Sequence, residues 1–387
     1  MSQLLNERWS ETKEALLEGL QGNRRASMAV CLENTRRSLT ESATAGATSA
    51  GNVATLNRVI LPVIRRVMPT VIANEIVGVQ PMTGPVGQIH TLRVRYADPS
   101  SEVTAGEEAL SPFKIASSYS GNDSSPAKAS TTSALEGTPG KRMSIQILKS
   151  PVEAKSRKLS ARWTFEAAQD AQAQQGIDIE AEIMAALAQE ITAEIDQEIL
   201  GSLRNLANVE ETYDQSLVSG TATFVGDEHA ALAIQMNRVS NLIAQRTRRG
   251  AGNWAVVSNQ ALTILQSATT SAFARTTEGT FEAPTNTKFV GTLNGAMKIY
   301  VNSYAVDSTD ILIGYKGSSE SDAPAFYCPY IPLMSSGVVL DPSTFEPVVS
   351  FMTRYGYVEL SNTASSLGNA ADYLGRVAIT SGNVKFS

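Results

Sequence analysis

The sequence predicts an α+β fold in which one long helix crosses a body assembled from segments far apart in the chain. Three observations support this class. A helical pattern without proline runs from Gly176 to Leu206, strand-like segments lie on both sides of it in the sequence, and a long polar insertion separates one pair of strands. Because these strands must share a core with the helix, we expect a body of distant segments with one domain inserted between them.

The long helix is expected to begin at Asp178, whose carboxylate can accept hydrogen bonds from first-turn N–H groups. A row of aliphatic side chains then recurs every four residues. An α-helix turns about 100° per residue, so the row drifts round the axis, and Glu194 and Glu198 come to occupy the side that the row faces earlier. The helix should therefore have different neighbours at its two ends. The row consists of Ile183, Leu187, Ile191, Ile195, Ile199 and Leu203.

Composition excludes several classes of protein. The 387 residues are 42% hydrophobic with a net charge of −6, so there is no overall electrostatic argument for nucleic-acid binding. The two cysteines, Cys31 and Cys328, cannot make a disulfide framework, and we expect both to act as small apolar side chains. The polar start of the chain is unlike a signal peptide, and no apolar run reaches the roughly 18 residues that a membrane span needs.

Residues 1–55 are expected to form an arm. Amphipathic helical patterns occupy Glu11–Leu20 and Arg24–Leu39, and residues 40–52 are small and polar. Such a composition is too polar to fold alone. Two interpretations remain open: a flexible linker, or an extension that reaches a neighbouring subunit.

A helix and a long hairpin follow the arm. The helix is predicted at Val53–Arg66, with a kink or a late start at Pro62. Alternating patterns then predict strands at Val86–Tyr96 and Met143–Lys149. Residues 97–142 between them are rich in Ser, Thr, Gly, Pro and Ala and too long for an ordinary connection. We therefore predict a hairpin arm that projects from the body, with a disordered surface loop as the alternative.

The second half of the chain mixes helices and strands. Helices are predicted at Phe165–Gln174 and Asp227–Arg246, and a third after an N-cap at Ser258. Asn294-Gly295 is a strong signal for a type I′ turn between paired strands within Gly291–Val301. Further strands are predicted at Lys158–Phe165, Trp254–Val257, Ile311–Tyr315, Ala325–Tyr330 and Val348–Leu360, with loops at 209–226 and 267–288.

Nothing in the sequence points to catalysis, a cofactor or a metal site. The two histidines, His90 and His229, lie on a predicted strand and at a helix start, which supports no catalytic triad or metal set. Phosphate-binding and zinc-protease motifs do not occur. The acidic residues Asp178, Glu180 and Glu182 complement the helix dipole. We predict that the protein is not an enzyme, and we assign no catalytic, cofactor-binding or metal-binding residue.

Two basic clusters each allow two interpretations. Arg246, Arg248 and Arg249 end a predicted helix, where basic side chains commonly form a solvated face that complements the dipole. An intersubunit or DNA-facing role is the alternative. The same two interpretations apply to the second cluster, which consists of Lys155, Arg157, Lys158 and Arg162.

Three blocks of sequence carry a family signature. The first is VIRRVMPTVIANEIVGVQPMTGPVGQI at 63–89, and the second joins EAKSRKL at 153–159 to EAAQD at 166–170. The third joins GYKG at 314–317 and AFYCPY at 325–330 to FEPV at 345–348 and TRYG at 353–356. Together and in this order, the blocks resemble the T4-type major capsid proteins of tailed bacteriophages.

The resemblance implies the HK97-type capsid fold. In that fold an N-terminal arm precedes a peripheral domain with a long spine helix, an extended hairpin loop projects before the helix, and an axial domain is inserted after it. On this chain we expect the arm at 1–55, the peripheral domain at 56–96 and 143–225, the extended loop at 97–142, the axial domain at 226–345, and the return strand with the C-terminus at 346–387.

The resemblance also implies a structural function. The chain would be a major capsid protein that self-assembles into pentamers and hexamers of an icosahedral phage head enclosing double-stranded DNA. Expected partners are further copies, portal, scaffold and decoration proteins, and packaged DNA held by weak nonspecific contacts through residues such as Arg246 or Arg248. No membrane is expected; the protein would belong to the virion capsid and assemble in the cytoplasm of the bacterial host.

Some properties of the family are not expected in this chain. A maturation protease removes an N-terminal segment in relatives, and the same cleavage is not expected here. Lys114, Lys128 and Lys141 are expected to be surface charges rather than parts of a covalent cross-link. The alternatives to a phage shell are an encapsulin-like cargo shell with the same fold, an enzyme, and a tail or baseplate protein.

Overall fold

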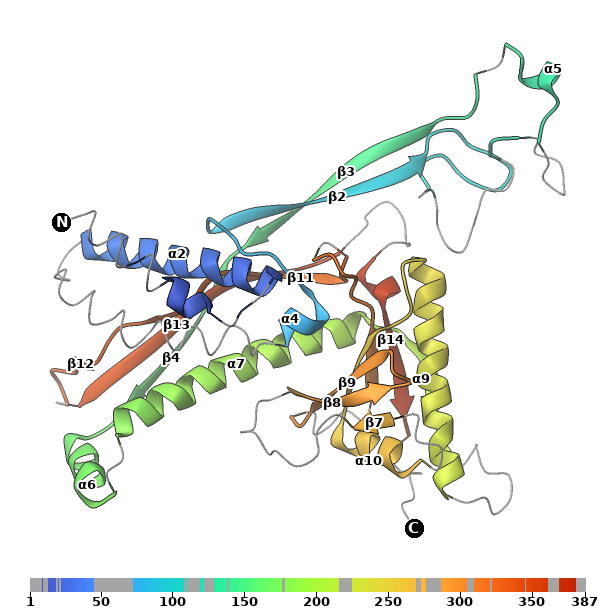
Figure 1. The fold of residues 1–387 in the computed structure, drawn as a ribbon. Helices are drawn as coiled ribbons and strands as arrows, with labels where there is room; N and C mark the ends of the chain where they lie inside the picture. Colours follow the sequence, from blue (N-terminus) through green and yellow to red (C-terminus); the bar gives the residue numbers. More distant parts are fainter. Residues whose placement is uncertain are drawn as a thin grey trace.

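The computed structural model describes most of the chain, and within the described residues the strands form two sheets and one two-stranded ribbon (Figure 1). The predicted helix at 53–66 lies outside the described residues. Those residues are 9, 13–18, 20, 22–44, 72–107, 109, 119–121, 129–137, 139–175, 178–215, 225–268, 273–275, 287–304, 310–320, 322–344, 346–360 and 369–380.

The long helix is α7, Ile179–Leu206, and it runs from α6 (Phe165–Gln175) at one end of the molecule to the far sheet at the other (Figure 1). Asp178 is its N-cap: the carboxylate accepts a hydrogen bond of 3.1 Å from the Glu180 N–H, as predicted. From Leu187 onward the predicted aliphatic row is buried, and it ends at Leu203 with no exposure.

The neighbours of α7 change along its length, which confirms the prediction from the drifting row. As far as Glu198 it lies against strands β4 (Lys155–Arg162) and β13 (Pro347–Glu359), and its C-terminal part also contacts side chains of the other sheet. There Gln197 and Asn302 exchange hydrogen bonds of 3.0 and 3.1 Å through their amides. The helix therefore joins the two sheets.

The sheet that α7 crosses from its N-terminal end, here the long sheet, has β13 at its centre. β4 and β11 (Ala325–Ser335) flank β13 in antiparallel pairing. The short strand β12 (Val339–Leu340) also pairs with β13, on the same edge as β11, and β1 (Gly78–Val79) pairs with β11 in parallel. Because strand side chains alternate, Val349, Phe351 and Tyr355 of β13 face the same core as α7.

Helix α2, Gly22–Thr44, covers the same face of the long sheet. Met28, Cys31 and Leu32 are almost completely buried there, and the Asn34 Nδ2 donates to the carbonyl oxygens of Met82 at 2.7 Å and Tyr330 at 3.1 Å. This corrects the predicted arm in two ways. The helix continues to Thr44, past the expected end at Leu39, and its apolar face packs on its own chain because β11 and β13 offer a matching apolar surface.

The other sheet, here the mixed sheet, lies at the far end of α7. Its strands run in the order β5 (Val209–Tyr213), β14 (Leu374–Ile379), β10 (Ile311–Gly314), β6 (Trp254–Val257), β9 (Met297–Asn302), β8 (Thr287–Leu293) and β7 (Phe273–Arg275). Helices α9 (Val225–Thr247) and α10 (Asn259–Ser267) pack on one face, while Trp254 and Tyr300 on the other face join the core of α7.

Local signals in the mixed sheet are confirmed. Ser258 caps α10 by accepting a hydrogen bond of 3.3 Å from the Ala261 N–H. Asn294 and Gly295 both have positive φ, 53° and 68°, as the type I′ turn between β8 and β9 requires.

Three predictions about this part of the chain are wrong. The segment 267–288, expected to be a loop, contains β7, which pairs with β8. Residues 209–213, expected in a loop, form β5, because β14 provides a parallel partner about 165 residues later in the chain that no local pattern reveals. The predicted boundaries at 226 and 345 also do not follow the sheets. β11 lies within them but pairs in the long sheet, whereas β5 and β14 lie outside them and pair in the mixed sheet.

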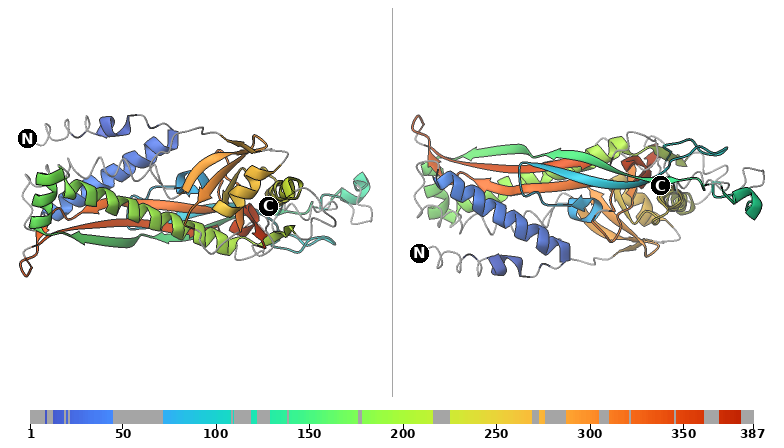
Figure 2. Two further views of the ribbon diagram at one scale, coloured as in Figure 1. Left: turned by 90° about the horizontal axis from the view of Figure 1, so that it is seen from below. Right: turned by 90° about the horizontal axis from the view of Figure 1, so that it is seen from above.

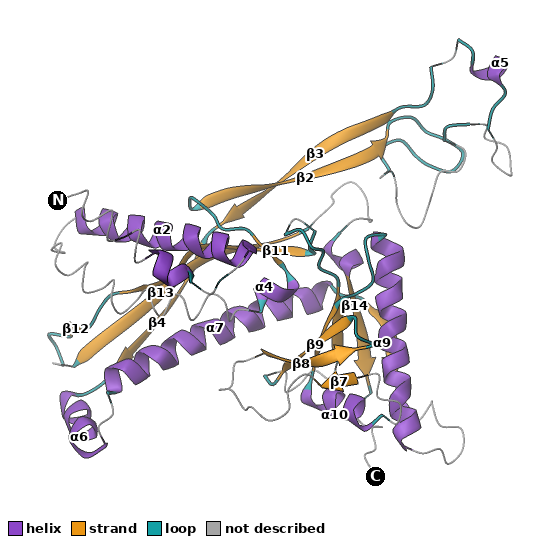
Figure 3. Cartoon of the chain, viewed as in Figure 1, coloured by secondary structure: helices purple, strands orange, loops and turns teal. Residues whose placement is uncertain are grey.

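The ribbon consists of β2, Val86–Tyr96, and β3, Met143–Glu153, in antiparallel register from Val86 opposite Glu153 to Tyr96 opposite Met143. It projects away from the body, and loops with the short helix α5 (Thr132–Leu135) form its tip (Figure 3). The predicted hairpin arm is therefore confirmed. Two further views show an elongated chain with the ribbon tip at one end and α6 at the other (Figure 2).

Candidate assembly surfaces

One face of the ribbon is apolar, and much of it is open to solvent. The register places Leu92 opposite Ile147, Val94 opposite Ile145 and Tyr96 opposite Met143, so these pairs share a face. Leu92, Met143, Ile145 and Ile147, here the apolar ribbon face, are 53–68% exposed. Contiguous exposed apolar side chains mark an interaction site more often than a free surface.

The opposite face of the ribbon carries Arg93 and Arg95, which are buried. The alternation of the strand is visible in the sequence, but the side that turns to the body is the basic one. The apolar ribbon face was therefore missed as a functional surface. Exposure of the apolar side could not be predicted, because it depends on how the ribbon leaves the body.

The tip of the ribbon has a small core of its own. The rings of Tyr96 and Tyr119 are in contact at a tilt of 53° with their centroids 4.5 Å apart, and Val103 and Ala109 are buried beside them. The Tyr119 hydroxyl donates to the Arg142 carbonyl at 2.5 Å and accepts from the Asp98 N–H at 3.2 Å. Hydrogen bonds from Arg142 also hold the pKa of Asp98 below its usual value. The described part of the insertion is thus folded within one chain.

A groove of about 390 Å³ lies at the opposite end of the molecule, where α6, the start of α7 and the β12 hairpin meet. Its apolar rim includes Phe165, Val338 and Leu340, each more than 40% exposed. Its acidic residues are Asp178 and Glu180, from the N-terminus of α7. We call this feature the corner groove.

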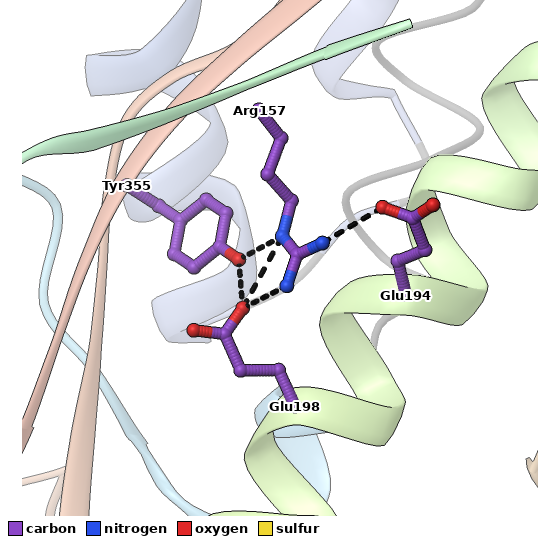
Figure 4. A network of polar contacts seen from close by, with 4 residues as sticks. All are labelled: Arg157, Glu194, Glu198 and Tyr355. Atoms are coloured by element: carbon purple, nitrogen blue, oxygen red, sulfur yellow. Dashed lines mark hydrogen bonds and ion pairs between the residues drawn. The ribbon is translucent and has the colours of Figure 1, made fainter.

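A polar network joins α7 to the edge strand β4 (Figure 4). The Arg157 guanidinium donates hydrogen bonds to Glu194 at 2.7 Å and to the Tyr355 hydroxyl at 2.6 Å. Its Nε and Nη2 also donate to the carboxylate of Glu198. Burial acts to raise the pKa of Glu198, but hydrogen bonds from Tyr355 and Arg157 outweigh it and hold that pKa below its usual value. Glu194 and Glu198, predicted to lie on the side of the helix that the aliphatic row faces at its start, are thus paired with a cation of the long sheet.

Several residues of the two predicted basic clusters form ion pairs with acidic side chains of the same chain. Arg246 forms an ion pair of 2.5 Å with Glu210, and Arg249 one of 2.5 Å with Asp322. On β4, Arg162 lies 3.8 Å from Glu346, while Lys158 is exposed on the face of the strand turned away from α7. These positions do not form one basic surface that would follow a nucleic-acid backbone.

The other predicted residues have structural surroundings. His90 is exposed on the ribbon, whereas His229 is buried with its Nδ1 2.5 Å from the Ser267 Oγ. Burial raises the pKa of both Cys31 and Cys328 to about 12.

Of the three lysines predicted to be surface charges, Lys141 lies within the described residues. Lys141 donates to the Ser100 Oγ at 3.2 Å, and Lys114 and Lys128 lie outside the described residues. Within the part of the chain that the structure describes, no group of His, Cys, Asp and Glu side chains could hold a metal ion. None of the described helices is long and apolar enough to span a membrane.

Comparison with known proteins decides the family. The model of the family described as Major capsid protein Gp23 matches residues 53–139 and 126–379. The chain belongs to this family of major capsid proteins. It is therefore a structural protein with an α+β capsid fold and not an enzyme, as predicted. Proteins of this family are virion components built from copies of one chain, which confirms the predicted homo-oligomer and virion location.

Two major capsid proteins similar in sequence agree with this assignment. The major capsid protein of Vibrio phage KVP40 is 30% identical over 419 residues, which cover 84% of this chain and 80% of the relative. That of Enterobacteria phage T4 is 29% identical over 408 residues, covering 81% and 76%. Among solved structures, a chain of Mycobacterium phage Bobi has a TM-score of 0.48 at 14% identity over 80% of this Gp23-family chain and 90% of its own length. The capsid of Myoviridae phage XM1 gives 0.44 at 12% identity over 78% and 88%.

Proposed function

We propose that this chain is the shell subunit of an icosahedral phage head, forms pentamers and hexamers, and encloses double-stranded DNA in the HK97-type fold. Membership of the major capsid protein family supports the proposal. The observation that carries it in the structure is the projecting ribbon, whose apolar face is left open by its own chain. A single copy is therefore an incomplete unit, and further copies would cover this face.

The division of the chain into domains follows as part of the proposal. The unit built on the mixed sheet would be the axial domain that meets its copies around five-fold and six-fold axes. The long sheet with α7 would be the peripheral domain, and the ribbon with its tip the extended loop. Rings of this kind need different surfaces on the two sides of one subunit, which an elongated chain with unlike ends provides.

Other partners are proposed more generally. Portal and scaffold proteins, with decoration proteins as a further class, would contact the assembled shell, which would form in the cytoplasm of the bacterial host. Contact with packaged DNA would be weak and nonspecific. The net charge of −6 and the ion pairs of Arg246 and Arg249 support weak rather than tight binding.

Sedimentation of the purified full chain tests the proposed function. We expect most of the protein to sediment as large closed particles and the remainder as capsomer-sized rings. Deletion of the ribbon and its tip, residues 86–153, should leave no closed particles, because the proposed intersubunit cover is lost. A full chain that remains a monomer at assembly concentrations, alone and with its scaffold protein, would refute the proposal.

A further inference from the structure

We propose that Arg204 and Arg376 form an oxyanion-binding site that takes one phosphate group, either a free phosphate ion or a phosphate of a DNA backbone. The site lies where the C-terminal end of α7 reaches the edge of the mixed sheet (Figure 1). It is separate from the ribbon and from the corner groove. The inference does not depend on the proposed function, because ion binding can be measured on the unassembled chain.

The fold brings the two arginines together from distant parts of the chain. On β14, Arg376 lies opposite Leu312 of β10, and Leu312 belongs to the core that α7 covers, so Arg376 faces the helix. The Arg376 N–H donates a hydrogen bond of 3.0 Å to the carbonyl of Asn208, just beyond the end of α7. Arg204 lies in the last turn of that helix and is therefore a close neighbour of Arg376.

The cluster has more positive than negative charge. Arg376 forms an ion pair with Asp310, with 3.3 Å between Nη1 and Oδ2, and this carboxylate can balance only one of the two guanidinium groups. On the adjacent strand β5, Glu210 and Glu211 are paired with arginines of α9 instead. Among the described residues of this cluster, one positive charge is therefore left unbalanced.

The hydrogen bonding of the cluster is also incomplete. The Nε atoms of Arg204 and Arg376 are both buried, and neither has a hydrogen-bond partner within the part of the chain that the structure describes. Burial lowers the pKa of the Arg204 guanidinium, Asp310 acts against this, and Arg376 adds to it. A buried donor without an acceptor costs free energy, and in folded proteins it commonly marks the place of a water or an ion.

A phosphate group supplies what the cluster lacks. Each guanidinium has five N–H donors in a planar fork, and phosphate has several acceptor oxygens, so one ion can accept from both arginines. The side chain of Arg376 is 25% exposed, which leaves an entrance from solvent. A basic side chain at a helix C-terminus also complements the dipole, but that role involves Arg204 alone and does not explain the second guanidinium.

Calorimetric titration of the unassembled full chain with inorganic phosphate at constant ionic strength tests the site. We expect one phosphate per chain with a dissociation constant of about 0.1–5 mM. Arg204→Gln should weaken binding about tenfold or more, because charge-assisted hydrogen bonds are lost. Arg204→Lys should recover only part of the affinity, since it keeps the charge but lacks the fork. The control is Arg238→Gln on α9, an arginine that is 70% exposed, and it should bind phosphate within about twofold of the parent.

Thermal unfolding gives a second readout and shows that each variant folds. Phosphate should raise the Tm of the parent and of Arg238→Gln by about 2–4 °C over chloride at equal ionic strength, because it binds the folded chain. The rise should be much smaller for Arg204→Gln. Without phosphate, Arg204→Gln should be at least as stable as the parent, since it removes a half-buried charge that lacks a counterion.

Competition with a short DNA duplex identifies the source of the phosphate group. If the duplex weakens phosphate binding and itself binds less tightly to Arg204→Gln, the occupant is a backbone phosphate. If the duplex has neither effect on a chain that binds phosphate, the occupant is the free ion. A parent chain that binds no phosphate, or that binds it no better than Arg204→Gln, overturns the site and leaves the shell function standing.

Discussion

The Ile72 backbone N–H donates a hydrogen bond of 2.9 Å to the carboxylate of Asp196, which α7 holds in the core at 2% exposure. Burial raises the pKa of Asp196 to about 7, and the single hydrogen bond from Ile72 only partly opposes it. A carboxyl group at the centre of the long helix is therefore protonated in the folded chain at pH values where it is ionised in the unfolded chain.

This difference predicts how stability depends on pH. Between about pH 4 and pH 7 the folded chain holds a proton that the unfolded chain has lost, so the free energy of unfolding falls as pH rises, by at most about 4 kcal/mol. Asp196→Asn keeps an oxygen that can accept from Ile72 and removes the charge. Denaturant unfolding of the unassembled chain at pH 5 and pH 8 should show this loss in the parent and a much smaller one in Asp196→Asn. An equal loss in both would show that Asp196 is not the group responsible.

Arg157 should stabilise the contact between α7 and the long sheet. Arg157→Met keeps the apolar stem but loses the hydrogen bonds to Glu194, Glu198 and Tyr355. Because the guanidinium is partly exposed to water, we expect a loss of about 1–2 kcal/mol in the free energy of unfolding. Lys158→Met on the same strand is the matched control and should change it by less than about 0.5 kcal/mol. Similar losses for the two variants would mean that the network contributes nothing specific.

Gly356 should be required where the base of the ribbon crosses β13. A Cβ at this position would collide with the Val152 side chain and approach the Glu153 carbonyl at 3.2 Å. Gly356→Ala should therefore destabilise the chain by about 1–3 kcal/mol through overpacking. Val152→Ala in the same chain makes room for the new methyl group, so the double variant should be more stable than the sum of the single effects predicts. Strictly additive losses in denaturant unfolding would contradict this explanation.

Tyr119 should hold the ribbon tip closed before assembly. Tyr119→Phe keeps the ring contact with Tyr96 but loses the hydroxyl that bonds Arg142 and Asp98. We expect faster proteolytic cleavage within residues 97–142 of the unassembled chain, and an unchanged far-ultraviolet circular dichroism spectrum. Tyr304→Phe, at an exposed position near β9, should be cleaved at the parental rate. Equal cleavage of parent and Tyr119→Phe would show that the tip core does not protect this segment.

Local signals were sufficient for much of the fold. Asp178 and Ser258 cap their helices by hydrogen bonds that the sequence suggested, and Asn294-Gly295 adopts the expected turn. These features depend on residues a few positions apart. The hairpin was also predictable, because its two strands alternate clearly on either side of a polar insertion.

The remaining features depend on contacts between distant residues. β5 is polar, and only its pairing with β14 makes it a strand. The buried face of α2 has its partner on β11, about 300 residues away, so the sequence alone could not show whether it packs on its own chain or another. The corner groove likewise combines α6, α7 and β12, and no single pattern in the sequence indicates it.

Electron cryomicroscopy of particles formed by the full chain tests the central claim most directly. The account predicts closed shells of pentamers and hexamers in which every ribbon lies across a neighbouring copy and its apolar face is covered. Well-ordered copies whose ribbons fold back on their own bodies, or a compact monomer with no shell, would contradict it.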